Sequence, residues 1–183
     1  MEYDALSAGV EPGGLTNRTE IKILICYVIK SLDAPVSKMQ LNEIVQEEGL
    51  ANYFEVNQAI SELISQGSVE CRIEDTEELL YITEKGLDAA NSLEINLPRS
   101  VREKAINSAI RIITLARRER ENKIEVSEAD GGYNVTFVLG DEKSELMKLT
   151  VFVADRIQVE TVKRNFLEDP VKLYSVIIAS LTV

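Results

Sequence analysis

A change of hydrophobic period at Gly67 constrains the fold of this chain more than any other feature of its sequence. From about Tyr53 to Gln66 the apolar residues recur at helical spacing, as Val56, Ala59, Ile60, Leu63 and Ile64. After Gly67, every second residue is apolar from Val69 to Ile73, which is the period of a strand with one buried face. The sequence therefore predicts a helix that ends at Gly67 and leads directly into a strand.

The next segment predicts a hairpin and a further helix. Leu80 and Ile82 mark a second strand, which follows the first after a turn at Asp75-Thr76. Thr83 is placed to cap a helix that runs from Glu84 to about Leu93. Two strands this close in sequence pair most simply with each other, so we expect a short two-stranded hairpin followed by a helix.

Two more helices are predicted upstream. Asn17-x-x-Glu20 is typical of a helix start, and the apolar residues from Ile21 to Leu32 form a mostly buried helix that Asp33-Ala34-Pro35 ends. Ser37-x-x-Gln40 is a capping box for a shorter helix that ends at Gly49. The first half of the chain thus predicts three helices, a two-stranded hairpin and a fourth helix.

The second half predicts an α+β domain in the order α-β-β-β-α-α. Pro98 opens a helix that runs to Glu121, and Asp155 and Asp169-Pro170 begin the last two helices. Three strands lie between, at 123–128, 133–139 and about 144–153, joined by Asp130-Gly131-Gly132 and Gly140-Asp141-Glu142-Lys143. We expect two domains, residues 1–97 and 98–183.

The end of the chain favours self-association. The final predicted helix carries the apolar stretch Ile177-Ile178-Ala179-Ser180-Leu181, which exposes little polar surface. An open three-stranded sheet also has two edges that need cover. We therefore expect a homodimer whose interface lies in the second domain; a role for this domain in sensing a small molecule is the alternative.

Charge is divided unevenly between the two predicted domains. The 183 residues include 20 Lys and Arg against 31 Asp and Glu, a net charge of -11. Residues 1–97 carry -12 and residues 98–183 carry +1, and the range 98–123, which contains the predicted helix, alone carries +5. An acidic balance of this size opposes binding to a phosphate backbone.

Several classes of function are excluded or disfavoured. The chain has no histidine, so it cannot form a Ser/His/Asp or Cys/His catalytic unit. Cys26 and Cys71 belong to no ligand-spaced cluster and are expected to be small buried hydrophobes. Apolar runs stop far short of the ~20 residues that a membrane span needs. We expect a cytoplasmic protein that is no enzyme and needs no metal or cofactor.

Two segments resemble the winged helix-turn-helix of bacterial transcriptional regulators. Ala59-Ile60-Ser61-Glu62-Leu63-Ile64-Ser65-Gln66-Gly67-Ser68-Val69 is similar to the end of its third helix leading into the wing. Leu80-Tyr81-Ile82-Thr83-Glu84-Lys85-Gly86 is similar to the Y-x-[IL]-T-x-x-G step that leaves the wing. The resemblance implies a winged-helix domain at residues 1–97.

Three further segments are similar to a family of uncharacterised bacterial proteins of about this length. They are Glu2-Tyr3-Asp4-Ala5 through Gly13-Gly14-Leu15, Ile21-Lys22-Ile23-Leu24, and Gly49-Leu50-Ala51-Asn52-Tyr53-Phe54. That family is a domain of unknown function with a winged-helix N-terminal half. It has no assigned activity, so this resemblance implies a fold and no function.

The winged-helix resemblance implies candidate DNA contacts, because the third helix of such a domain enters the major groove beside the wing. The candidates are Asn52, Tyr53, Asn57, Gln58, Ser61 and, in the wing, Arg72. Asn and Gln can pair with adenine, and Tyr and Ser can bond to phosphates. The same region carries acidic residues that repel phosphates: Glu55, Glu62, Glu70, Glu74, Asp75, Glu77 and Glu78.

Two functions follow from these observations. The resemblance implies a non-enzymatic, DNA-binding transcriptional regulator. The charge division favours an alternative, an acidic winged-helix module that binds no DNA and docks a basic partner or the +5 helix of another copy. Arg117, Arg118 and Arg120 are candidates for binding an acidic partner or a phosphate, and they also fit a helix end whose cations offset its own dipole.

Overall fold

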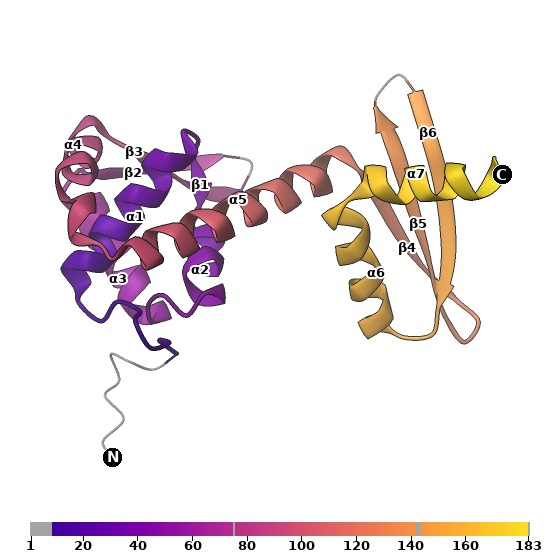
Figure 1. The fold of residues 1–183 in the computed structure, drawn as a ribbon, viewed down its shortest axis with the longest axis horizontal. Helices are drawn as coiled ribbons and strands as arrows, with labels where there is room; N and C mark the ends of the chain where they lie inside the picture. The colour runs from indigo at the N-terminus through magenta and orange to yellow at the C-terminus, as the bar shows by residue number, and fades with distance from the viewer. Residues whose placement is uncertain (1–8, 75, 142–143, 183) are drawn as a thin grey trace, which may run out of the picture. The chain divides into compact units, whose positions relative to one another are not determined.

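The computed structural model describes residues 9–74, 76–141 and 144–182, and these form a mixed α+β protein with seven α-helices and two three-stranded antiparallel sheets (Figure 1). The chain divides into two compact units, the first ending at Ile113 and the second beginning at Thr114. The division falls inside a long helix, later than the expected boundary at 97/98, because Val101, Ala105 and Ala109 of that helix are buried in the core of the first unit.

The first unit consists mainly of helices around a small sheet. Its elements are α1 (Arg18–Leu32), β1 (Val36–Ser37), α2 (Lys38–Glu47), α3 (Tyr53–Ser65), β2 (Val69–Glu74), β3 (Glu77–Ile82), α4 (Glu84–Leu93), a 3-10 turn (Glu94–Asn96) and the first part of α5 (Arg99–Glu121). Helix α1 is buried on most of its surface and packs against α3 and α4.

The predicted helix starts are confirmed by side-chain caps. The Asn17 side chain accepts a hydrogen bond from the Thr19 N–H at 2.8 Å. Ser37 and Gln40 form the complete capping box at the start of α2, and Thr83 caps α4. Each cap satisfies backbone N–H groups that have no partner within the helix, so local chemistry alone places these boundaries.

The small sheet has one more strand than the sequence predicts. Strand β3 pairs with β2 from Val69↔Ile82 to Glu74↔Glu77, as expected of the hairpin, although Asp75 of the predicted turn lies outside the described residues. Strand β1 adds to the other edge of β3. It is two residues long, which is too short for any alternation of apolar and polar residues to reveal it.

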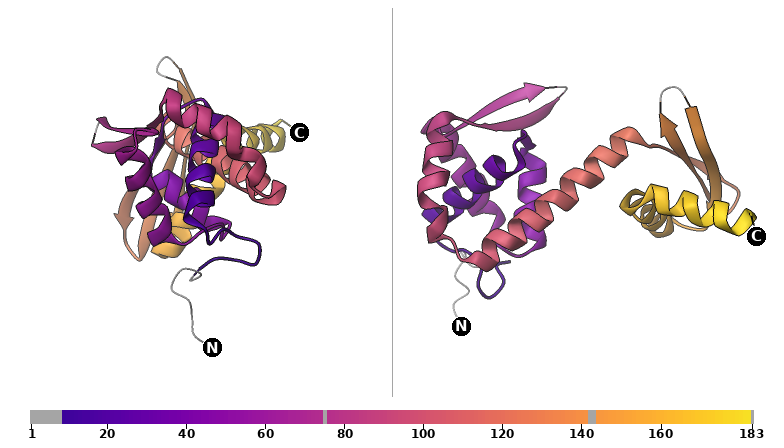
Figure 2. Two further views of the ribbon diagram at one scale, coloured as in Figure 1. Left: turned by 90° about the vertical axis from the view of Figure 1, so that its left-hand side faces the viewer. Right: turned by 45° about the horizontal axis from the view of Figure 1, so that its top comes forward.

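The second unit is an antiparallel sheet with two helices on one face (Figure 2). Strands β4 (Lys123–Ala129), β5 (Gly132–Asp141) and β6 (Ser144–Val153) lie in chain order and are followed by α6 (Arg156–Glu168) and α7 (Pro170–Leu181). Phe137 of the central strand packs on Phe166 of α6 with ring centroids 4.6 Å apart. The antiparallel three-stranded sheet predicted for this half is present, and of its predicted loop at 140–143, Glu142 and Lys143 lie outside the described residues.

The two cysteines differ in burial, contrary to the expectation that both are buried. Cys26 on α1 is buried, and burial raises the pKa of its thiol to about 11. Cys71 on β2 is only partly buried, because cover on that face of the strand decreases from Val69 towards the exposed Ile73.

This difference predicts selective alkylation. In the native chain at mildly alkaline pH, iodoacetamide should modify Cys71 and leave Cys26 intact, because only an exposed thiolate reacts readily. Peptide mass spectrometry after a brief pulse measures the two sites separately, and unfolding in urea should equalise them. Equal modification of both thiols in the native chain would contradict the burial of the Cys26 thiol on α1.

Candidate functional site

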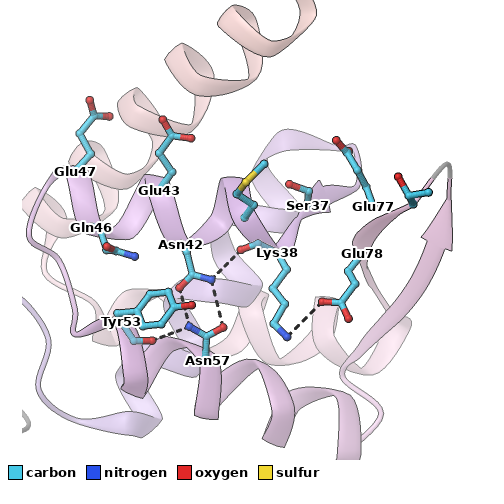
Figure 3. Close-up of a pocket in the computed structure, with 12 residues that line it drawn as sticks. Ser37, Lys38, Asn42, Glu43, Gln46, Glu47, Tyr53, Asn57, Glu77 and Glu78 are labelled. Atoms are coloured by element: carbon cyan, nitrogen blue, oxygen red, sulfur yellow. Dashed lines mark hydrogen bonds and ion pairs between the residues drawn. The ribbon is translucent and has the colours of Figure 1, made fainter. Parts of the chain in front are cut away.

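An open groove of about 920 Å³ lies on the first unit, between α2, the start of α3 and the β2–β3 hairpin (Figure 3). Its lining residues are Ser37, Lys38, Met39, Asn42, Glu43, Gln46, Glu47, Tyr53, Asn57, Thr76, Glu77 and Glu78. Its size is in the range of ligand-binding pockets. We call it the acidic groove.

The lining of the acidic groove combines negative charge with exposed apolar surface. Among the described residues that line it, four are glutamates and one, Lys38, is basic. Lys38 Nζ lies 3.3 Å from a carboxylate oxygen of Glu78 across the groove (Figure 3). Met39 and Tyr53 are 72% and 48% exposed. A solvent-facing surface of this kind suits a ligand that carries both cationic and apolar groups.

Helix α2 contributes half of the residues that line the acidic groove, and its capping box sets where the helix begins. Met39 and Glu43 are four residues apart, as are Glu43 and Glu47, so the three share one side of the helix. Figure 3 shows Glu43 and Glu47 pointing the same way. The sequence prediction did not single out this side of α2, although the Ser37-Gln40 box and the spacing of four were there to indicate it.

Part of the acidic charge is compensated by α5 within the same unit. Glu47 pairs with Arg111 and accepts a hydrogen bond from Ser108 Oγ at 2.8 Å, and Lys104 Nζ lies 3.7 Å from Glu48. Glu43, by contrast, has no hydrogen-bond or ion-pair partner in the part of the chain that the structure describes. Two cations of the basic helix therefore act on their own chain, and uncompensated charge remains at Glu43.

Asn57, a predicted base-reading residue, is engaged with a neighbouring helix. Its Nδ2 donates to Asn42 Oδ1 at 3.0 Å, and Asn42 Nδ2 donates back to Asn57 Oδ1 at 3.3 Å. The two amide groups also donate to the carbonyls of Tyr53 and Lys38, at 2.9 and 2.8 Å. This reciprocal pair uses the amide edge that would recognise adenine and ties α2 to α3.

Other candidate DNA contacts are also occupied by local structure. Asn52 is the N-cap of α3, with its Oδ1 2.8 Å from the Phe54 N–H, and is 6% exposed. Ser61 Oγ donates to the Asn57 carbonyl at 3.0 Å. Tyr53 and Gln58 are exposed on α3. Five of the six candidate residues thus lie at the start of α3 or along it, where Tyr53, Gln58 and Ser61 are exposed and Asn52 and Asn57 are not, and the sixth, Arg72, is exposed on β2.

The one basic candidate in the hairpin, Arg72, is paired with an acid. Its guanidinium makes two hydrogen bonds to Glu70, at 3.0 and 2.8 Å, and lies 4.4 Å from the centre of the Tyr81 ring. The hydrogen bonds from Arg72 lower the pKa of Glu70. Arg72 therefore offers little net positive charge to a phosphate backbone.

The acidic residues of α3 are paired with α1. Arg18 makes hydrogen bonds to Glu55 at 2.8 Å and to Glu62 at 3.3 Å, and Lys22 Nζ lies 3.1 Å from Glu62. The hydrogen bond from Lys22 is the largest cause that lowers the pKa of Glu62. This side of α3 is close to neutral, so the negative charge of the region is concentrated at the acidic groove and the hairpin.

The predicted arginine cluster of α5 lies in the second unit and is only partly available. Arg118 Nη1 donates to the Leu167 carbonyl at 3.0 Å and also to the Glu168 carbonyl, at the end of α6. Arg117 lies 3.8 Å from Glu121, and Arg120 is exposed. Arg118 therefore satisfies carbonyls that α6 leaves open at its C-terminus, a structural role.

The described ranges contain no group of three or more His, Cys, Asp or Glu side chains that could hold a metal ion. No helix in them combines the length and the apolar character needed to cross a membrane.

Comparison with known proteins gives one result. The chain finds no match among curated proteins or among solved structures. A family model described as Domain of unknown function (DUF4364) matches residues 21–181. That range covers most of both units, so the chain belongs to the DUF4364 family.

Proposed function

We propose that this chain is a winged-helix protein-interaction module whose acidic groove binds a basic, amphipathic segment of a partner protein. The winged-helix assignment is supported by the order α1-β1-α2-α3-β2-β3, in which β1 closes the sheet against a hairpin at the position of a wing. A fold of this kind carries many functions, so the choice among them rests on the surface.

The observation that carries the proposal is the composition of the acidic groove. Glu43, Glu77 and Glu78 line the same groove as the exposed side chains of Met39 and Tyr53. A segment with Lys or Arg on one side and aliphatic residues on the other would satisfy both the charge and the apolar surface. Complementary charge of this kind sets partner choice and association rate, and burial of the apolar side chains adds affinity.

The experiment uses the full chain and a synthetic probe. The probe is a fluorescein-labelled amphipathic helical peptide with lysines on one face and leucines on the other. Its fluorescence anisotropy should increase when it is titrated with the chain at micromolar concentration, because the bound peptide tumbles more slowly. The same peptide with glutamate in place of lysine is the matched control. The proposal is supported if the lysine peptide binds and the glutamate peptide does not. It is rejected if both peptides bind equally well or if neither binds.

DNA binding is the second candidate, favoured by the exposure of Tyr53 and Gln58 on the helix that winged-helix regulators place in the major groove. Against it stand the Asn57–Asn42 and Arg72–Glu70 pairs and the four glutamates of the groove. Selection from random duplex DNA at low salt tests it. Enrichment of one sequence that Gln58→Ala abolishes would establish DNA readout.

A further inference from the structure

One ion pair spans the acidic groove and joins helix α2 to the β2–β3 hairpin. Lys38 Nζ lies 3.3 Å from a carboxylate oxygen of Glu78 (Figure 3). Lys38 is the only basic residue among the described residues that line the groove. The pair therefore places the chain's own ammonium group among the carboxylates to which the proposed partner would bring its cations.

The strand pairing of the small sheet determines that these two residues meet. Strand β1 runs antiparallel to β3, with Ser37 opposite Leu79. Lys38 follows Ser37 and Glu78 precedes Leu79, so the two charged residues extend this register by one position. Asn42 Nδ2 donates to the Lys38 carbonyl at 2.8 Å, which holds the Lys38 backbone independently of its ammonium group. Loss of the ammonium group should therefore leave both walls of the groove in place.

Helix α2 itself gains nothing from a positive charge at Lys38. Lys38 is the first residue of the helix, whose first turn contains no acidic residue. A cation there lies at the positive end of the helix dipole, where positive charge is unfavourable. Within the part of the chain that the structure describes, Glu78 is the one partner of the Lys38 ammonium group.

This ion pair is exposed enough for a ligand to replace it. The Lys38 and Glu78 side chains are 38% and 53% exposed. Exposed pairs contribute little stability, because water screens the two charges and ordering two long side chains costs entropy. A cation of a bound segment can therefore contact Glu78 at low cost while Lys38 turns its ammonium group into solvent on a flexible stem.

We infer that Lys38 occupies the position on Glu78 that a cation of the bound segment takes, and so weakens the binding of basic segments. The inference rests on the proposed function, because it concerns a ligand of the same groove. It makes Lys38 a specificity-determining residue: a segment must displace the ammonium group, so segments with little positive charge are excluded. A purely structural role, in which Lys38 only joins the hairpin to α2, predicts no gain in affinity when the ammonium group is removed.

The first test removes the ammonium group from the full chain. Lys38→Met should bind the fluorescein-labelled lysine peptide about threefold more tightly than the wild type, as measured by anisotropy. Lys30→Met is the matched control, because it removes the same charge from α1 and breaks the ion pair with Glu94, which does not line the groove. It should change the affinity by less than about 1.5-fold, since only screened, long-range interactions change.

The outcomes separate this inference from the function on which it rests. If the wild type binds the peptide and Lys38→Met binds it no more tightly, the inference is wrong and the proposed function stands. An equal gain in Lys38→Met and Lys30→Met also overturns the inference, because net charge then explains both. If neither the wild type nor Lys38→Met binds the peptide, the proposed function fails and the inference fails with it.

The second test shows whether Lys38 acts through Glu78. In a Glu78→Gln background, Lys38→Met should raise the affinity for the peptide less than in the wild type, because no carboxylate is uncovered. The same gain in both backgrounds would mean that Lys38 only adds charge to the groove, which overturns the inference. Lys38→Gln should reproduce the gain of Lys38→Met in the wild type. A gain confined to methionine would show that added apolar surface strengthens binding, and would also overturn it.

Discussion

Replacing Gly86 by valine should lower the free energy of unfolding of the first unit by about 3 kcal/mol, the upper part of the usual range for overpacking a core. Gly86 is buried in the first turn of α4. A Cβ atom there would lie 2.1 Å from the Ser68 carbonyl oxygen, well inside contact distance. That oxygen cannot move easily, because it accepts hydrogen bonds from the Thr83 N–H at 3.2 Å and the Thr83 hydroxyl at 3.0 Å.

Chemical denaturation followed by circular dichroism measures the effect. Asp88→Val is the matched control, because it places the same β-branched side chain on the exposed face of α4 and should change stability by only about 0.5 kcal/mol. Comparable losses in both variants would mean that a β-branched side chain on α4, and not the approach of α4 to Ser68, determines the cost. The same contact explains why glycine follows Thr83 by three residues in the motif that leaves the hairpin.

Reversing two charges in the acidic groove should weaken binding of the lysine probe peptide by about tenfold or more. Glu43→Lys/Glu78→Lys removes two attractions and adds two repulsions, each worth ~0.3–1 kcal/mol at a solvent-exposed site. Anisotropy titrations of the variant and the wild type at low and physiological salt measure the loss. The difference should shrink at higher salt, since exposed charges are screened.

The control for this variant carries the same change of charge elsewhere. Glu84→Lys/Asp88→Lys alters two exposed acids of α4 that do not line the acidic groove. It should bind the peptide within about twofold of the wild type, because only long-range, screened interactions change. An equal loss in both variants would mean that net charge alone attracts the peptide and that the groove has no specific role.

The elements of this fold that follow from local chemistry could be predicted from the sequence. Helix starts at Asn17, Ser37, Thr83, Asp155 and Asp169 rest on side chains that bond to their own neighbours, so short-range patterns locate them. Strand β1 could not be predicted, because two residues pair with a strand more than 40 positions away. The partial exposure of Cys71 likewise depends on which part of the hairpin the helices cover.

The candidate site could be predicted only in outline. The polar side of α3 is visible in the sequence, but the pairing of Asn57 with Asn42 is a contact between two helices and cannot be read from either one. The Arg72–Glu70 pair is different, because residues two apart share a face of a strand. That spacing could have shown in advance that the hairpin's one arginine is neutralised.

The charge division between the two halves acquires a partial physical explanation. Lys104 and Arg111 of α5 pair with Glu48 and Glu47 at the C-terminal end of α2, so the basic helix offsets some of the acidic charge of the unit on which it packs. These ion pairs with α5 involve only acidic residues at the C-terminal end of α2. Glu43, four residues earlier, faces the groove with its charge unopposed, which is why binding of a cationic segment is the function proposed for this surface.

The most direct test of the central claim is to map where ligands bind, by amide NMR of the full chain titrated separately with the lysine peptide and with duplex DNA. If the acidic groove binds basic segments, the peptide shifts the amide signals of Met39, Glu43 and Glu78, and equimolar DNA at physiological salt leaves the spectrum unchanged. DNA-induced shifts centred on Tyr53, Gln58 and Ser61, with no response of the groove to the peptide, would contradict the account.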